Sequence, residues 1–155
     1  MSQTALLVVD IQTGTLAPLI GKEQFVKNVN ALIDHFHKEY LPIVFIKKVG
    51  YGELSQKLHR DANDLAVTKT QMNTFKAPEF KTLLSEHDFS EFVVVGLMSN
   101  ACVQATCKGA LAENFPVTLI SDAHDSVIKP MQNVWNKKLK NAGVITMTTK
   151  EYIKK

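Results

Sequence analysis

The chain has 155 residues, of which 45% are hydrophobic and 21% charged. This length fits one domain, spanning residues 1–155, and this composition excludes an intrinsically disordered chain. Eighteen Lys and Arg against fifteen Asp and Glu leave a formal net charge of +3, which is too small to predict a partner such as nucleic acid or an anionic membrane.

Short apolar runs alternate along the chain with longer segments of helical periodicity. The first run, at residues 5–9, is continuously apolar, as expected of a strand that is covered on both faces. Residues 22–40 follow with apolar side chains at three- and four-residue steps, which predicts an amphipathic helix. Further strands are expected at 43–46, 65–68, 92–95, 117–120 and 144–147, and further helices at 79–87, 102–114 and 130–141. Between the first strand and the first helix, Gly14 and Pro18 indicate a loop, and the lysine-rich end of the chain is expected to be a solvated face.

Six strands alternating with helices predict a parallel sheet, because right-handed crossovers place helices on both of its faces. We therefore expect the α/β class, as a three-layer α/β/α sandwich with a six-stranded, mostly parallel sheet. In open sheets of this kind, ligands bind outside the carboxyl ends of the strands. The residues that follow the strands are therefore the candidates for function.

Three reactive side chains lie at such positions. Asp10 follows the first predicted strand, Lys69 follows the third, and Cys102 comes shortly after the fourth. Taken singly, Asp10 could cap a helix, Lys69 could be a solvated surface lysine, and Cys102 could be an inert buried residue. Their joint occurrence at one edge of the sheet favours a functional site.

These residue types suit nucleophilic catalysis by cysteine. A thiol is mostly protonated at neutral pH, and only the thiolate attacks well. Cys102 opens a predicted helix, so the helix dipole and the charge of a nearby Lys69 would favour the thiolate. The Asp10 carboxylate could take the thiol proton and pass it to a leaving group. The sequence therefore predicts that Cys102 is ionised at neutral pH.

The segments around these residues resemble the isochorismatase-like cysteine hydrolases. The resemblance is carried, in chain order, by VVDIQ at 8–12, VTKTQMNTF at 67–75 and VVVGLMSNACVQAT at 93–106, and it extends to Ser-Asp-Ala at 121–123. It covers nearly the whole chain and implies a Rossmann-like topology. Its third segment is the most specific of the three.

The resemblance implies a catalytic triad of Asp10, Lys69 and Cys102. Cys102 would attack a carbonyl carbon to give a thioester-type intermediate, Asp10 would serve as general base and then as general acid, and Lys69 would hold the thiolate and orient Asp10. The resemblance also implies a cis peptide bond between Leu97 and Met98. The backbone N–H groups of Met98 and Cys102 would then form the oxyanion hole.

The chain departs from the nicotinamidase branch of this family, which carries an Asp-x-His…His metal site. Residues 47–61 hold His59 without such a pair, and a metal needs several converging ligands. We therefore expect neither a metal nor another cofactor. Isochorismatases proper generally lack the cysteine, so Cys102 favours hydrolysis of an amide-type C–N bond in a small-molecule substrate.

The candidates for the substrate pocket are Gln12, Leu16, Phe75 and Asn100. The second cysteine, Cys107, lies roughly 140° around the helix from Cys102 and is expected in the core. His124 is expected in a loop, and Asp122 is expected to shape that loop or to cap a helix.

A function of another class remains open. A relative without hydrolytic activity could bind a small molecule, or could sense oxidants through an accessible Cys102 thiol. The presence of all three reactive groups favours the hydrolase. Because relatives commonly assemble, the resemblance also implies a homo-oligomer, either a dimer or a tetramer.

The compartment is predicted from three features. No apolar run approaches the ~20 residues of a membrane span. The segment MSQTALLVVD lacks a basic region and a cleavage site, so we expect a mature N-terminus. Two cysteines five residues apart do not indicate a disulfide framework. We therefore expect a cytoplasmic protein.

Overall fold

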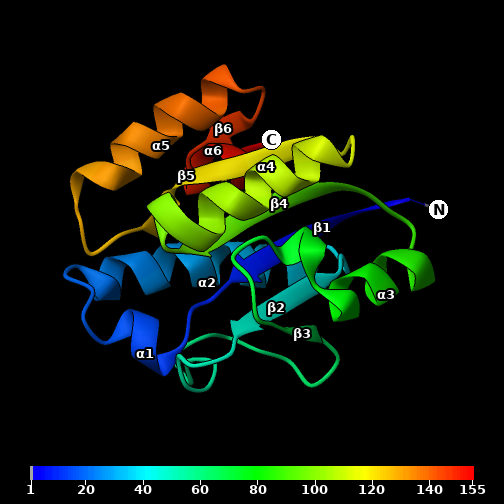
Figure 1. Ribbon diagram of the computed structural model, residues 1–155, viewed down its shortest axis with the longest axis horizontal. Helices are drawn as coiled ribbons and strands as arrows, with labels where there is room; N and C mark the ends of the chain where they lie inside the picture. Colours follow the sequence, from blue (N-terminus) through cyan, green and yellow to red (C-terminus); the bar gives the residue numbers. More distant parts are fainter. Residues whose placement is uncertain (1) are drawn as a thin grey trace.

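Six parallel strands form the centre of the protein (Figure 1), seen in a computed structural model that describes residues 2–155. The strands are β1 (Gln3–Val9), β2 (Ile43–Lys48), β3 (Leu65–Lys69), β4 (Phe89–Leu97), β5 (Val117–Asp125) and β6 (Ile145–Met147). They lie in the order β3-β2-β1-β4-β5-β6, and every neighbouring pair is parallel. The expected six-stranded sheet is confirmed, and it is parallel throughout.

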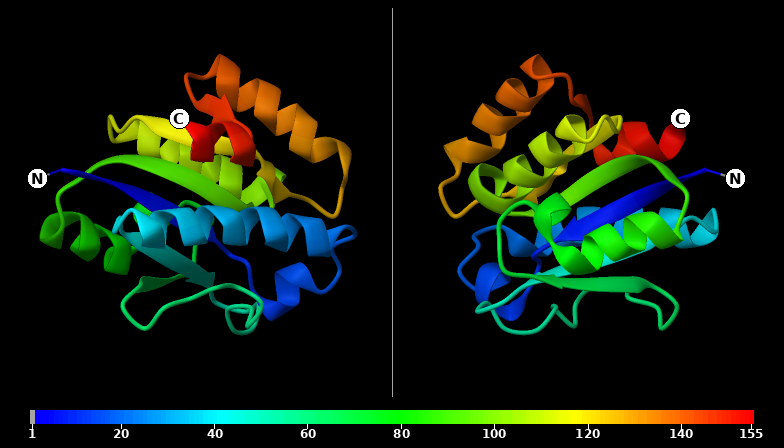
Figure 2. Two further views of the ribbon diagram at one scale, coloured as in Figure 1. Left: turned by 180° about the vertical axis from the view of Figure 1, so that it is seen from behind. Right: turned by 45° about the vertical axis from the view of Figure 1, so that its right-hand side comes forward.

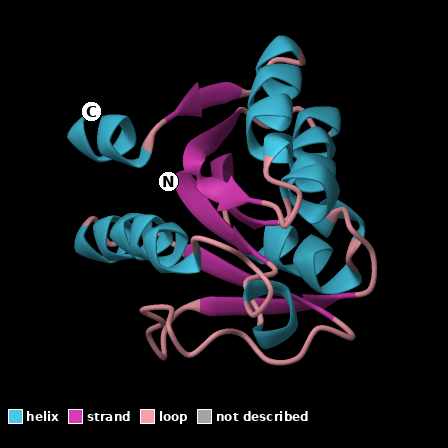
Figure 3. Cartoon of the chain, turned by 90° about the vertical axis from the view of Figure 1, so that its left-hand side faces the viewer, coloured by secondary structure: helices cyan, strands magenta, loops and turns pink. Residues whose placement is uncertain are grey.

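Helices cover both faces of this sheet, as Figure 3 shows with the sheet between two helical layers. The helical segments are α1 (Thr13–Leu16), α2 (Lys22–Lys38), η1 (Thr74–Lys76), α3 (Pro78–Glu86), η2 (Ser99–Val103), α4 (Gln104–Ala112), α5 (Pro130–Asn141) and α6 (Thr149–Lys154). In Figure 2, α2 and α6 lie on one face, and α3, α4 and α5 lie on the other. The three-layer α/β/α sandwich is therefore confirmed.

The alternation of side chains along β1 explains the two separate cores. Successive residues of a strand point to opposite faces, so Leu6 and Val8 pack into the core beneath α2, while Leu7 and Val9 pack into the core beneath α3 and α4. Both faces of β1 are thereby buried, as its unbroken apolar run predicts.

Two short helices were not predicted. Residues 13–16, expected as a loop, form α1, whose first turn is held by a hydrogen bond from Gln12 N–H to Thr15 Oγ1 (3.0 Å). The lysine-rich end forms α6, which begins with a capping box between Thr148 and Glu151. Tyr152 on this helix is buried and stacks on Phe36 of α2. The expectation of a solvated tail is therefore wrong for this turn.

The fifth strand is longer than its apolar run. It pairs with β4 through Leu119 opposite Val94, and again through His124 opposite Gly96. Residues 120–123 therefore leave the pairing with β4, and that pairing resumes beyond them. His124 lies in this strand and not in a loop, which corrects the prediction made for it.

Gly96 allows the carboxyl end of β4 to approach β1 closely. Its φ of 136° is a conformation that side-chain-bearing residues rarely adopt, and a Cβ at this position would collide with the backbone of Val9. The chain that follows β4 is therefore brought beside the residue that follows β1. Among the described residues 2–155, no helix combines the length and the apolar character needed to cross a membrane.

Candidate active site

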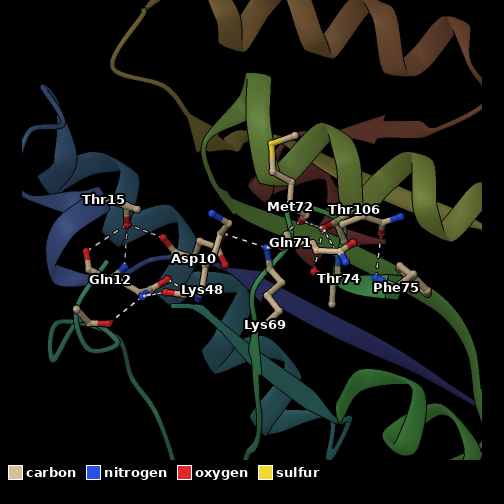
Figure 4. A network of polar contacts seen from close by, with 12 residues as sticks. Asp10, Gln12, Thr15, Lys48, Lys69, Gln71, Met72, Thr74, Phe75 and Thr106 are labelled. Atoms are coloured by element: carbon tan, nitrogen blue, oxygen red, sulfur yellow. Dashed lines mark hydrogen bonds and ion pairs between the residues drawn. The ribbon is translucent and has the colours of Figure 1, made fainter. Parts of the chain in front are cut away.

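The carboxyl ends of β1 and β3 hold a buried ion pair (Figure 4). Lys69 Nζ lies 3.2 Å from Asp10 Oδ2, and the two side chains are 0% and 3% exposed. Lys69 Nζ also donates to the backbone oxygens of Gln71 (2.9 Å) and Met72 (2.8 Å). An ammonium group has three N–H donors, so all of them are used and the position of the Lys69 side chain is fixed.

Asp10 is held in an unusual backbone conformation at the end of β1. Its φ is 52°, a left-handed value that Asp tolerates better than most residues. Its N–H donates to Ile46 O (3.0 Å), and its carbonyl accepts from Thr15 Oγ1 (2.5 Å). Burial raises the pKa of Asp10 above its ordinary value of 3.8, while the charge of Lys69 and the thiol of Cys102 lower it.

One oxygen of the Asp10 carboxylate has no hydrogen-bond partner among residues 2–155. Asp10 Oδ1 is buried, and no group in residues 2–155 donates a full hydrogen bond to it. A buried acceptor without a partner is costly in a folded protein. Asp10 Oδ1 is therefore suited to take a proton from a neighbouring thiol or to accept an N–H from a bound molecule.

Cys102 lies in the turn η2, between the end of β4 and the start of α4 at Gln104. It is 6% exposed. Burial, together with the negative charge of Asp10, raises its pKa to about 11, and Lys69 only partly opposes this. The expected resting thiolate is therefore wrong: at neutral pH the thiol is protonated, because burial and the carboxylate outweigh the ammonium.

Asp10 and Cys102 share one cavity of about 170 Å³. The residues that line it are Asp10, Gly14, Thr15, Lys48, Tyr51, Met72, Leu97, Met98, Ala101 and Cys102. Lys69 lies behind this wall, where it contacts Asp10 and the backbone of Met72. The strand-end positions predicted from the sequence therefore do meet in space.

The four residues predicted to line the pocket lie outside that lining. Gln12 is buried and hydrogen-bonds to the end of β2. Leu16 belongs to the core beneath α2, and Phe75 belongs to the opposite core. Asn100 Oδ1 accepts a hydrogen bond from Ser126 Oγ (3.0 Å). This prediction is corrected because each side chain turns inward or toward a neighbouring loop.

Sequence reasoning missed Lys48 and Tyr51 as lining residues. Both lie between the strands expected at 43–46 and 65–68, in a segment for which no strand or helix was predicted. Lys48 is in fact the last residue of β2, so the same strand-end rule that found Asp10 would have found it.

The peptide bond between Leu97 and Met98 is cis. Both residues line the cavity, and Met98 O accepts hydrogen bonds from Ala101 N–H (3.0 Å) and Val103 N–H (3.1 Å). The chain leaving β4 therefore curls directly into the turn that carries Cys102.

A buried histidine supports this turn from behind. His124 Nε2 lies 2.7 Å from Asn136 Oδ1, and His124 Nδ1 lies 2.7 Å from Ser99 Oγ. Because the amide oxygen can only accept, Nε2 carries the proton and Nδ1 accepts from the hydroxyl of Ser99. Burial lowers the pKa of His124 below its ordinary value of 6.5. Ser99 begins η2, so this chain of hydrogen bonds fixes the start of the turn.

The second cysteine is a core residue. Cys107 is fully buried, and burial raises its pKa to about 12. His59, considered above as a lone metal ligand, pairs with Asp34 (2.9 Å). Within residues 2–155, no group of three or more His, Cys, Asp or Glu side chains is arranged to hold a metal ion.

The strand order of this sheet reverses between β1 and β4, as in doubly wound nucleotide-binding folds, and ligands bind at such a reversal. Asp10 follows β1 and Cys102 follows β4. The fold and the site thus define a parallel α/β protein with a candidate active site at its topological switch point.

Comparison with known proteins identifies the family. The model of the isochorismatase domain matches residues 4–151. The uncharacterized isochorismatase family protein YddQ of Bacillus subtilis is 26% identical over 138 residues, which span 77% of this chain and 76% of that protein. The chain therefore belongs to the isochorismatase-like hydrolase family.

Two solved structures have the same fold. An isochorismatase hydrolase from Oleispira antarctica superposes with a TM-score of 0.90 at 20% identity, over 99% of this chain and 97% of that one. A cysteine hydrolase from Pseudomonas syringae superposes with a TM-score of 0.88 at 17% identity, over 98% and 91% of the two chains.

We predict that His124 makes the fold sensitive to acid. Below pH 6.5 the unfolded chain takes up a proton on this histidine that the folded chain does not, so the free energy of unfolding falls as the pH falls, by at most about 1.4 kcal/mol per pH unit. His124→Gln removes this contribution. Urea denaturation followed by circular dichroism, from about pH 7 to about pH 5, should show a shallower decline for His124→Gln than for wild type. His59→Gln, at an exposed histidine, is the matched control; equal slopes in all three proteins would contradict the prediction.

We also predict opposite changes in the reactivity of Cys102. Asp10→Asn removes the charge that raises the pKa of Cys102, so alkylation by iodoacetamide at neutral pH should become faster; Lys69→Met should make it slower. The thiolate fraction changes about tenfold per unit of pKa. Mass spectrometry of the modified peptide measures each rate, with the buried Cys107 as an internal control. A slower reaction in Asp10→Asn would show that the carboxylate does not hold the thiol protonated.

Proposed function

We propose that this protein is a cysteine hydrolase that cleaves an amide-type C–N bond of a small molecule through a thioester intermediate, with Asp10, Lys69 and Cys102 as its catalytic triad. The observation that carries the proposal is the buried Asp10–Lys69 ion pair at a cavity that Asp10 and Cys102 line together, with Asp10 Oδ1 lacking a hydrogen-bond partner within residues 2–155.

The first step transfers a proton and forms a bond. The thiol proton moves from Cys102 Sγ to Asp10 Oδ1 as Sγ attacks the carbonyl carbon of the substrate. Negative charge leaves the carboxylate and appears on the substrate oxygen, so the net charge of the site is unchanged. The raised pKa of Asp10 suits it to hold this proton, and a base with a pKa closer to neutrality is a more effective general catalyst.

The developing oxyanion needs donors that are already in place. The backbone N–H groups of Met98 and Cys102 are the proposed donors. Met98 lines the cavity beside Cys102, which supports this role. The hydrogen bonds of Ser99 and His124 keep the turn between these two residues in one conformation.

The second half of the reaction reverses the proton transfer. Asp10 gives its proton to the substrate nitrogen, the C–N bond breaks, and an amine or ammonia leaves. A water molecule then attacks the thioester; Asp10 takes a proton from this water, and the C–S bond breaks as Asp10 returns the proton to Cys102 Sγ. The product is a carboxylic acid, and the free enzyme is restored.

The properties of Cys102 also favour hydrolysis over the sensing of oxidants. A redox-sensing cysteine is typically accessible and has a low pKa. Cys102 is 6% exposed, and its pKa is raised to about 11. A thiol of this kind reacts slowly with peroxide but remains available to a substrate held beside its base.

We predict that the triad is essential for turnover. Cys102→Ala, Cys102→Ser and Asp10→Asn should each lower kcat/KM by roughly a thousandfold or more, since each removes the nucleophile or its proton acceptor. The assay is ammonia release from a panel of small primary amides that includes nicotinamide, and circular dichroism checks that each variant is folded.

Cys107→Ala is the matched control, because it removes the buried cysteine that lies outside the site. It should keep the activity of the wild type. Full activity in Cys102→Ala would overturn the proposed function.

A further inference from the structure

A second lysine lies at the candidate active site and takes no part in the proposed reaction. Lys48 ends β2, and its register partner on β3 is Lys69. Lys48 lines the same cavity as Asp10 and Cys102, and its charge is close enough to lower the pKa of Asp10. Figure 4 shows Lys48, Asp10 and Lys69 gathered at the ends of their strands.

The charge of Lys48 is not neutralised by the protein. Lys69 is paired with Asp10, and the preceding residue, Lys47, is paired with Glu53 (2.7 Å). In the described part of the chain, residues 2–155, Lys48 forms no ion pair with a carboxylate. Its Nζ lies 4.9 Å from the centre of the Tyr51 ring, a cation–π contact that holds the ammonium without cancelling its charge.

A buried glutamine fixes the backbone of this lysine. Gln12 Nε2 donates to the backbone oxygens of Lys48 (2.9 Å) and Gly52 (2.8 Å), and Gln12 Oε1 accepts from Lys48 N–H (2.8 Å). Gly14 N–H donates to Tyr51 O (2.8 Å). The side-chain amide of Gln12 thus spans the segment that carries both Lys48 and Tyr51, so this wall of the cavity is preorganised.

The cavity leaves two opposite polar groups without partners. Asp10 Oδ1 is an acceptor that needs an N–H or O–H, and the Lys48 ammonium needs an anion. With Asp10 negative and both Lys69 and Lys48 positive, the site carries one net positive charge before a ligand binds. An anionic ligand would neutralise this charge.

The size of the cavity limits such a ligand. A volume of about 170 Å³ is small beside the roughly 300–1,000 Å³ of most ligand pockets. Apolar side chains, Met72, Leu97 and Met98, form much of the remaining lining. The cavity therefore suits a short molecule with a polar group at each end and a few carbon atoms between them.

We propose that Lys48 binds a carboxylate of the substrate, so that the substrate is a small amide that also carries a carboxylate, such as the monoamide of a short dicarboxylic acid. This inference rests on the proposed function for its amide end and on Lys48, Tyr51 and Gln12 for its acidic end.

Kinetics with matched amides test the inference. Malonamate and succinamate carry the carboxylate; malonamide and succinamide are their neutral counterparts. In Lys48→Met the ratio of kcat/KM for the anionic amide to that for the neutral one should fall roughly 10- to 100-fold, as expected for the loss of one charged hydrogen bond. Most of the change should be in KM. Lys48→Arg should restore the preference, and Lys47→Met, next to it on the strand, should behave as wild type.

A binding measurement separates this inference from the proposed function. Succinate should slow the alkylation of Cys102 by iodoacetamide at mildly alkaline pH in wild type and Lys47→Met, and should not do so in Lys48→Met. If succinate protects Cys102 but no amide is hydrolysed, the proposed function is overturned while the carboxylate-binding site is supported.

Two results would overturn the carboxylate site itself. One is the absence of protection in wild type. The other is an equal loss of activity on anionic and neutral amides in Lys48→Met, accompanied by a shift of the acid limb of the pH profile; Lys48 would then act by tuning Asp10.

Discussion

The buried ion pair between Asp10 and Lys69 is the constraint on which the rest of the site depends. Removing two charges from water costs several kcal/mol per ion unless each charge is fully coordinated. Lys69 meets this condition only by using Asp10 Oδ2 and two backbone carbonyls, those of Gln71 and Met72. The ends of β1 and β3 and the segment after β3 must therefore converge. That convergence builds one wall of the cavity and leaves Asp10 Oδ1 without a hydrogen-bond donor among residues 2–155.

Burial and this same ion pair together determine the resting protonation state of Cys102. A lysine near a cysteine suggests a thiolate, but the Lys69 charge is already balanced by Asp10, and the carboxylate favours the protonated thiol of Cys102. In the proposed reaction, the thiolate then forms only as the proton moves to Asp10. This arrangement keeps an uncharged sulfur in a buried place, and it links deprotonation to the arrival of a substrate that can accept the negative charge. A sequence pattern identifies the groups, but the sign of a pKa shift depends on burial and on every charge around the sulfur.

Local sequence patterns were enough to predict the three layers of the fold and the positions of the three strand-end residues. The run at residues 5–9 gave a strand buried on both faces, and Asp10, Lys69 and Cys102 were found by position alone. The pocket lining failed because it depends on the direction of side chains in irregular segments: Gln12 precedes the unpredicted helix α1 and turns inward. His124 was misplaced because β5 continues beyond a bulge, and bulges are set by pairing with a neighbouring strand rather than by an apolar run. A capping box did mark the start of α6, so that helix was predictable from the residues at 148–151.

Gln12, which was wrongly predicted to line the pocket, matters most for the proposed recognition of the substrate. Asp10 and Gln12 are separated by one residue after β1, and they contact different strands. Asp10 pairs with Lys69 of β3, and Gln12 hydrogen-bonds to the backbone of Lys48 at the end of β2. One short segment therefore positions both the proposed base and the Lys48 cation, so backbone hydrogen bonds rather than a flexible loop set the distance between them. In the reaction proposed above, such a site would select its substrate by length and charge together, since a carboxylate on Lys48 helps only when the carbonyl reaches Cys102.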